Sequence, residues 1–146
     1  MGKIEQTLKK IKDDVKPLLD EMYPDLKEGI AFAYQDDFQE WFGMLFDMPK
    51  WQMKSGLINI EKLIDSMSER RAIETSVGLE DYERITDFGY ISVVDIEGEH
   101  HLIDGFHRVL VAKQRDLLQL KGVIWEKKSN NHPNCAKIRK LIINNL

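Results

Sequence analysis

The sequence predicts an α+β fold, with helices in its N-terminal half and a small mixed sheet with flanking helices in its C-terminal half. Apolar residues recur every three or four positions over most of the first 73 residues, which is typical of amphipathic helices. After Gly78 the spacing changes to short β-rich runs separated by turn residues. The chain therefore divides, by prediction, into a helical region over residues 1–50 and a sheet-containing domain over residues 51–146.

Two helices are expected in the N-terminal region. Residues 3–22 have apolar side chains at helical spacing, and Pro17 within them predicts a kink or a break near Lys16. Residues 30–48 carry a stripe of aromatic side chains. Such a stripe favours a helix that packs against a core over a ligand-binding box.

The next segment is expected to turn and then to form a third helix. Pro49 and the "KSG" of residues 54–56 predict turns between helical segments. A new helical pattern covers residues 59–73, and Asn59 is its predicted N-cap because an asparagine side chain can accept a hydrogen bond from the first turn.

The C-terminal domain begins with a predicted hairpin. Its strands are residues 90–96 and 100–105, joined at Glu97 and Gly98. A helix is expected from about Phe106 to Leu120, with Gly122 as its left-handed C-terminal residue. A strand over residues 123–127, a polar loop and a last helix over residues 135–145 complete the predicted order.

Composition narrows the classes of function. No apolar run approaches the roughly 20 residues that span a bilayer, so no membrane partner is expected. The single cysteine, Cys135, cannot form an internal disulfide, which fits a reducing, cytoplasmic location. The formal net charge of -4 disfavours non-specific binding to duplex DNA, whereas a few local donors are enough to bind a nucleotide.

The segment "LIDGFHRVLVAKQ", residues 102–114, combines a strand, a glycine and the start of a helix. A helix N-terminus presents unpaired N–H groups and partial positive charge, which attract phosphate. Gly105 lets the backbone approach a ligand, Arg108 offers a forked cation, and His107 can donate a hydrogen bond or take a proton. A plain reading stays open, in which Asp104 caps the helix and Arg108 pairs with a surface carboxylate.

The same residues resemble the signature of the ParB/sulfiredoxin superfamily, in which a strand, a D-G-x-H-R core and a helix with small residues follow one another. The resemblance spans about residues 85–126, including the hairpin and the strand after the helix, and residues 57–73 match more loosely the helix that precedes the hairpin. It does not extend over residues 1–50. It implies a ParB/sulfiredoxin-like sheet over residues 51–146, preceded by the helical N-terminal region.

The resemblance also implies a ligand. Members of the superfamily bind nucleotide phosphates at this turn, which points to ATP or CTP, with Mg²⁺, as the cofactor. The residues implied in nucleotide binding are Gly105, Phe106, His107 and Arg108. Asp104 would orient the turn or hold the metal ion.

Two departures from the superfamily pattern limit the function. Sulfiredoxins have their catalytic cysteine where this chain has Phe106, so sulfinic-acid reduction is excluded. Partitioning proteins tend to have two adjacent arginines where this chain has Arg108 alone.

The leading expectation is a nucleotide-binding protein that hydrolyses or transfers a phosphate. The alternatives are a ParB-like module that binds or cleaves DNA, and a non-catalytic scaffold that uses the aromatic N-terminal helices, through which self-association is also expected.

Phosphoryl transfer would use three predicted catalytic residues. His107 and Asp104 come from the turn, and a further carboxylate must accept the proton of the phosphate acceptor. Glu74 is chosen from the acids that precede the hairpin.

His100 and His101 point to opposite faces of a strand, and His100 shares the face of Asp104, so His100 is the better candidate to reach the same site. The simpler interpretation is that His100 is an exposed histidine of a strand.

Overall fold

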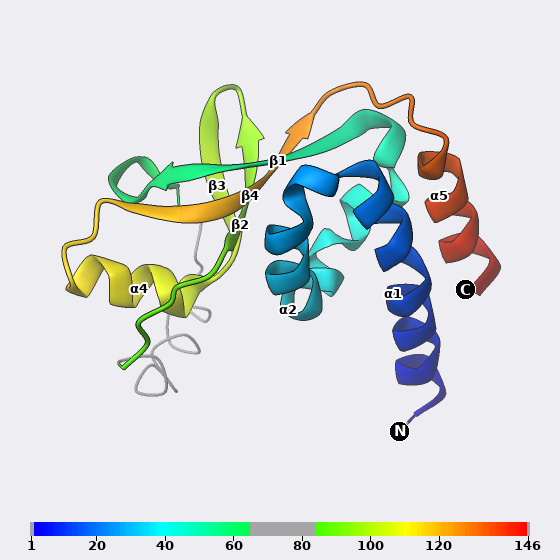
Figure 1. Cartoon of the computed structure of the whole chain (residues 1–146), viewed down its shortest axis with the longest axis horizontal. Coiled ribbons are helices and arrows are strands. Elements are labelled where there is room, and N and C mark those ends of the chain that lie inside the picture. The colour runs from blue at the N-terminus through cyan, green and yellow to red at the C-terminus, as the bar shows by residue number, and fades with distance from the viewer. Residues whose placement is uncertain (1, 65–83, 146) are drawn as a thin grey trace.

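A computed structural model describes residues 2–64 and 84–145. The α-helices are α1 (Lys3–Met22), α2 (Lys27–Phe46), α4 (Phe106–Gln114) and α5 (Asn134–Asn145). The strands are β1 (Trp51–Asn59), β2 (Ile91–Ile96), β3 (Glu99–Asp104) and β4 (Gln119–Lys127), and short 3-10 turns cover Pro24–Leu26, Met48–Lys50 and Ile60–Lys62. The predicted α+β class is confirmed (Figure 1).

The strands form one mixed sheet in the order β1-β4-β2-β3. β4 pairs antiparallel with β1 and parallel with β2, and β2 pairs antiparallel with β3. The β2–β3 pair is the predicted hairpin. Glu97 and Gly98 at its tip have φ of +54° and +86°, and Asp95 Oδ1 accepts a hydrogen bond from the Gly98 N–H at 2.9 Å.

Helices cover both faces of this sheet (Figure 1). One cluster of buried side chains joins α1, α2 and α5 to the face that carries Val123 and Trp125. A second cluster joins α4 to the opposite face, which carries Ile91, Val93 and Ile124. The first cluster includes residues from both sides of the boundary near residue 50, and the division into two regions stays a prediction.

The aromatic stripe on α2 is part of the first cluster. Phe38 is 4% exposed and Trp41 is 0% exposed, and the Trp41 ring meets the edge of Trp125 at a centroid distance of 5.4 Å. The expected packing of this helix against a core is confirmed. Of the three aromatic residues expected to form a partner-binding surface in the scaffold alternative, Phe38 and Trp41 are buried and Phe42 is half-buried.

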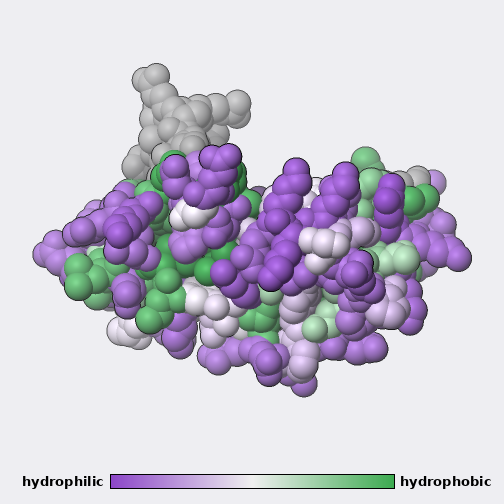
Figure 2. Space-filling view, turned by 90° about the horizontal axis from the view of Figure 1, so that it is seen from above, coloured by the Kyte–Doolittle hydropathy of each residue, from purple (hydrophilic) through white to green (hydrophobic). Residues whose placement is uncertain are grey.

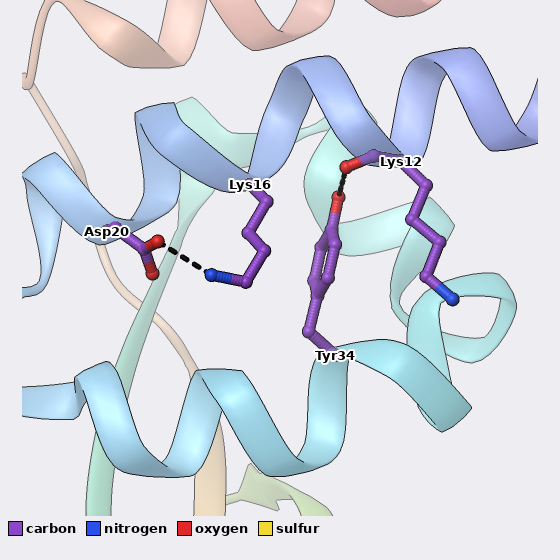
Figure 3. Close-up of polar contacts among 4 residues, drawn as sticks. All are labelled: Lys12, Lys16, Asp20 and Tyr34. Atoms are coloured by element: carbon purple, nitrogen blue, oxygen red, sulfur yellow. Dashed lines mark hydrogen bonds and ion pairs between the residues drawn. The ribbon is translucent and has the colours of Figure 1, made fainter.

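α1 continues through Pro17, so the predicted break near Lys16 is wrong. Val15 and Leu19, on either side of the proline, are fully buried, and their packing stabilises the helical backbone there. Polar contacts add to it: the Tyr34 hydroxyl of α2 donates to the Lys12 carbonyl at 2.6 Å, and Lys16 pairs with Asp20 at 2.8 Å (Figure 3).

Two glycine assignments were wrong. The "KSG" of residues 54–56, predicted to form a turn, lies inside β1. Gly122, predicted to end a helix, lies inside β4 opposite Gly56. α4 accordingly ends at Gln114 and not at Leu120. A Cβ atom on Gly122 would lie 2.7 Å from Cγ1 of Ile58, so this glycine makes room for a buried side chain of the neighbouring strand.

Asn59 caps a shorter element than expected. Its side chain accepts a hydrogen bond from the Glu61 N–H at 3.0 Å and so caps the 3-10 turn Ile60–Lys62. Most of the helix predicted over residues 59–73 lies outside the described residues. The strand predicted over residues 123–127 and the last helix are confirmed as parts of β4 and α5.

The face seen in Figure 2 is mainly hydrophilic, and its hydrophobic side chains form separate patches. Among the helices of the described ranges, none combines the length and the hydropathy needed to cross a bilayer.

Candidate functional site

The turn between β3 and α4, residues 104–108, is called here the Gly105 turn. Gly105 has a φ of +103°, in the left-handed region that favours glycine. A Cβ atom at this position would lie 2.7 Å from Cγ2 of Ile91, which is fully buried in β2. Both the backbone angle and the close packing therefore require glycine.

Asp104 does not cap α4 in the expected way. Its Oδ1 accepts a hydrogen bond from the Gly105 N–H at 2.8 Å, while the residue at the helix N-cap position is Gly105, which has no side chain to cap with. The first helical hydrogen bond runs from the Val109 N–H to the Gly105 carbonyl at 2.9 Å. Asp104 thus holds the turn, and its carboxyl remains half-buried at the start of the helix.

Arg108 is anchored beside this turn. Its Nη1 donates to the carbonyl oxygens of Tyr90, at 2.6 Å, and Phe88, at 3.3 Å, and its Cζ lies 5.1 Å from the centre of the Phe32 ring. Tyr90 precedes the Ile91 against which Gly105 packs, so the guanidinium lies close to the turn. Within the described ranges, Nε and Nη2 of Arg108 have no acceptor and the side chain forms no ion pair with a carboxylate.

A buried polar cluster lies under the turn on the α2 face of the sheet. We call it the Asp37 cluster, and it consists of Asp37, Trp41, Ser92 and Asp104. Trp41 Nε1 donates to Ser92 Oγ at 3.0 Å, and the Ser92 hydroxyl donates to Asp37 Oδ2. Ser92 faces Asp104 across the β2–β3 pair, where a register shift follows Ser92.

Burial and a neighbouring carboxyl raise the pKa of Asp37. The pKa rises to about 8, first because the 0% exposed side chain loses its hydration, and then because of the hydrogen bond and the negative charge of Asp104. The hydrogen bond from the Ser92 hydroxyl and, by a smaller amount, the Arg108 charge lower the pKa of Asp37. Near neutral pH, Asp37 is therefore mostly protonated.

Protonation of Asp37 also explains why its Oδ1 is buried without a hydrogen-bond donor among the described residues. Asp37 Oδ1 is buried and has no donor in the described part of the chain. Two ionised carboxylates have no hydrogen to share, whereas a proton on Asp37 allows this side chain to donate to Asp104. The pair thus carries one negative charge fewer beneath the turn.

The residues predicted for the site lie in several places. Asp104, His107 and Arg108 are half-buried at the Gly105 turn, whereas the side chain of Phe106 is 8% exposed and belongs to the core under α4. Any contact of Phe106 with a ligand would therefore involve its backbone. Glu74 lies outside the described residues.

His100 lies on the hairpin rather than at the turn. Its Nε2 is 3.8 Å from Oδ2 of Asp95, its partner across the β2–β3 pair. The structure therefore supports the interpretation of His100 as a strand histidine away from the turn.

The sequence-based interpretation missed Asp37, Ser92 and Trp41 as neighbours of the turn. One signal was available: Asp37 lies three residues after Tyr34 and four before Trp41, on the same helical face as both. An acid in the middle of a buried aromatic stripe needs a polar partner, which predicts a functional or pH-sensitive position.

The described side chains that could bind a metal ion do not form a complete metal site by themselves. Within residues 2–64 and 84–145, no three acidic, histidine or cysteine side chains gather as a metal ion would require. Mg²⁺ that arrives with a nucleotide needs only one or two protein carboxylates, and the half-buried carboxyl of Asp104 suits that role.

Comparisons of the chain with family models, with curated proteins and with solved structures find no match.

Proposed function

We propose that this protein binds a nucleoside triphosphate, ATP or CTP, with its phosphates at the Gly105 turn, and that it is a ParB/sulfiredoxin-like protein. The observation that carries the proposal is Arg108, held beside a helix N-terminus through Nη1 with two other nitrogens facing no acceptor in the described chain. The order β2, β3, Gly105 turn, α4, β4 agrees with what the resemblance implies for residues 85–126.

The electrostatics of the turn favour an anion. The N-terminus of α4 adds partial positive charge, and the guanidinium adds a permanent one. Because Arg108 is already fixed by two backbone carbonyls, binding a phosphate costs little further side-chain entropy. The proton on Asp37 removes a negative charge that would otherwise repel the phosphate.

The chemistry that follows is hydrolysis or transfer of a phosphate. The bond between the terminal phosphorus and its bridging oxygen breaks, and a bond from phosphorus to water or to a hydroxyl acceptor forms. His107, in the first turn of α4, would donate a hydrogen bond or a proton to a phosphate oxygen. Asp104 would hold Mg²⁺, which neutralises phosphate charge, and Glu74 remains the predicted acceptor of the proton that the attacking group loses.

The Arg108→Ala variant is expected to bind ATP or CTP about ten- to one-hundred-fold more weakly than the wild type, because charge-assisted hydrogen bonds contribute about 1.5–3 kcal/mol. Calorimetric titration with each nucleotide, with and without Mg²⁺, measures this loss.

Lys113→Ala is the matched control, since it removes the same charge from the exposed last turn of α4. It should bind like the wild type. Arg108→Lys keeps a cation that can still donate to Tyr90 and should retain part of the affinity, while thermal unfolding verifies that each variant folds. Failure of every nucleotide to bind, or equal affinity in Arg108→Ala, would contradict the proposal.

A further inference from the structure

A pocket of about 330 Å³ lies beside Phe32, whose ring also contacts Arg108. We call it the Phe32 pocket. It is formed by the start of α2, the segment before β2, and β4. Its lining includes Glu28, Phe32, Asp87, Gly89, Tyr90 and Lys121. This volume is at the lower end of the range for small-molecule sites, so the pocket suits a compact ligand group.

Two aromatic rings make the apolar part of the Phe32 pocket. The rings of Phe32 and Tyr90 have centroids 6.3 Å apart and planes inclined by 51°. Phe32 is 38% exposed, and its ring lies directly against Gly89, where an added Cβ would come within 1.9 Å of the ring. Gly89 has a φ of +57°, so the backbone there also favours glycine. The ring is thus held in place with part of its surface open to a ligand.

The polar part of the pocket has a distinct pattern of donors and acceptors. Glu28 and Asp87 supply carboxylate oxygens, and Asp87 is fixed because its Oδ1 accepts the Gly89 N–H at 2.9 Å. Lys121 supplies an ammonium group, 5.8 Å from the centre of the Tyr90 ring. Carboxylates accept hydrogen bonds from exocyclic amino groups, and an ammonium donates to a ring nitrogen or a carbonyl.

Arg108 connects the Phe32 pocket to the Gly105 turn. The same side chain donates to the Tyr90 carbonyl and stacks on Phe32, while its backbone belongs to the first turn of α4. A ligand with a phosphate at the turn and a planar ring in the pocket would therefore contact Arg108 at one end and, at the other, the Phe32 side chain on which Arg108 packs.

We propose that the Phe32 pocket binds the base of the nucleotide and selects bases that carry an exocyclic amino group, such as cytosine and adenine, over uracil. This inference rests on the proposed function for the position of the phosphates. The base stacks on Phe32 or Tyr90, and its amino group donates to Glu28 or Asp87. Uracil presents a carbonyl oxygen where cytosine presents the amino group, so the carboxylates would repel it.

The test compares CTP, UTP and inorganic tripolyphosphate by calorimetry in the presence of Mg²⁺. CTP is expected to bind the wild type at least about tenfold more tightly than UTP, from one lost hydrogen bond and one unfavourable oxygen pair. Phe32→Ala is expected to weaken CTP binding about five- to one-hundred-fold, because base–aromatic stacking is lost. It should weaken tripolyphosphate binding much less, because two backbone carbonyls still hold Arg108. Phe32→Tyr keeps an aromatic face and should restore CTP affinity.

The outcomes separate this inference from the proposed function. If tripolyphosphate binds but CTP and UTP bind equally, or if Phe32→Ala does not alter CTP affinity, the base pocket is wrong and the phosphate site stands. If tripolyphosphate does not bind but cytidine binds and loses affinity in Phe32→Ala, the pocket stands and the phosphate site is wrong. If neither tripolyphosphate nor cytidine binds, both are wrong.

Discussion

The Asp37→Asn variant is expected to keep the same free energy of unfolding at pH 9 as at pH 6, while the wild type loses stability over that interval. In the unfolded chain, the Asp37 carboxyl ionises near its ordinary pKa of 3.8, and in the folded chain near 8. Between these values the folded state holds an extra proton, so stability is full below the unfolded pKa and falls as the pH rises through the folded one. From pH 6 to pH 9 the loss is about 3 kcal/mol, since each pH unit below the folded pKa contributes about 1.4 kcal/mol.

Asparagine is the suitable replacement because it imitates the protonated acid. Its carbonyl oxygen can accept from Ser92, and its amide can donate to Asp104 without any titration. Urea unfolding at pH 5, 7 and 9, followed by tryptophan fluorescence, measures the difference. Asp116→Asn, at an exposed position, is the control and should follow the wild type. A difference between Asp37→Asn and the wild type that is the same at all three pH values would refute the protonated pair.

The Gly105→Ala variant is expected to lose about 2–5 kcal/mol of its free energy of unfolding and to bind nucleotide poorly. The left-handed backbone costs a residue with a Cβ about 1–2 kcal/mol, and overpacking against Ile91 adds about 1–3 kcal/mol. Ile91 is fully buried and β-branched, so it cannot move aside readily. Relief of the contact would shift the turn and with it the start of α4.

Gly98→Ala separates the two contributions. Gly98 has a φ of +86°, yet no atom lies within 4 Å of the place where its Cβ would be. Gly98→Ala should therefore show only the backbone cost and leave nucleotide binding intact. Urea unfolding of both variants measures the difference that the Ile91 contact makes. Equal destabilisation of the two variants would show that the packing at Gly105 is not tight.

The parts of the fold that depend on local chemistry could be predicted from the sequence. The hairpin follows from Glu97 and Gly98 between two β-rich runs, and the start of α4 follows from Gly105 between a strand and an apolar helical pattern. Both signals lie within a few neighbouring residues, and the structure confirms both.

The parts that depend on packing between distant segments could not be predicted. Gly56 and Gly122 carry the local signature of breakers, but they lie in paired strands because Ile58 and Ile124 fill the space beside them. β1 was missed for this reason. No local pattern indicates that tertiary packing will require a glycine inside a strand.

The candidate site likewise has one part that could be predicted from local sequence and one part that depends on packing between distant segments. The Gly105 turn is contiguous, so its motif is visible in the sequence. Asp37 and Ser92 are 55 residues apart in the chain and meet only because α2 packs on the sheet face next to Asp104. Phe32, on the same helix, reaches Arg108 for the same reason.

The central claim is that nucleotide phosphates bind at the Gly105 turn, and backbone amide chemical shifts test it most directly. A two-dimensional ¹H–¹⁵N titration of the wild type with CTP and Mg²⁺ should give its largest shift changes at the amides of residues 105–108 and at Nε of Arg108. Tripolyphosphate should reproduce these changes. Saturating shift changes that leave residues 105–108 untouched, or no change at millimolar nucleotide, would contradict the account.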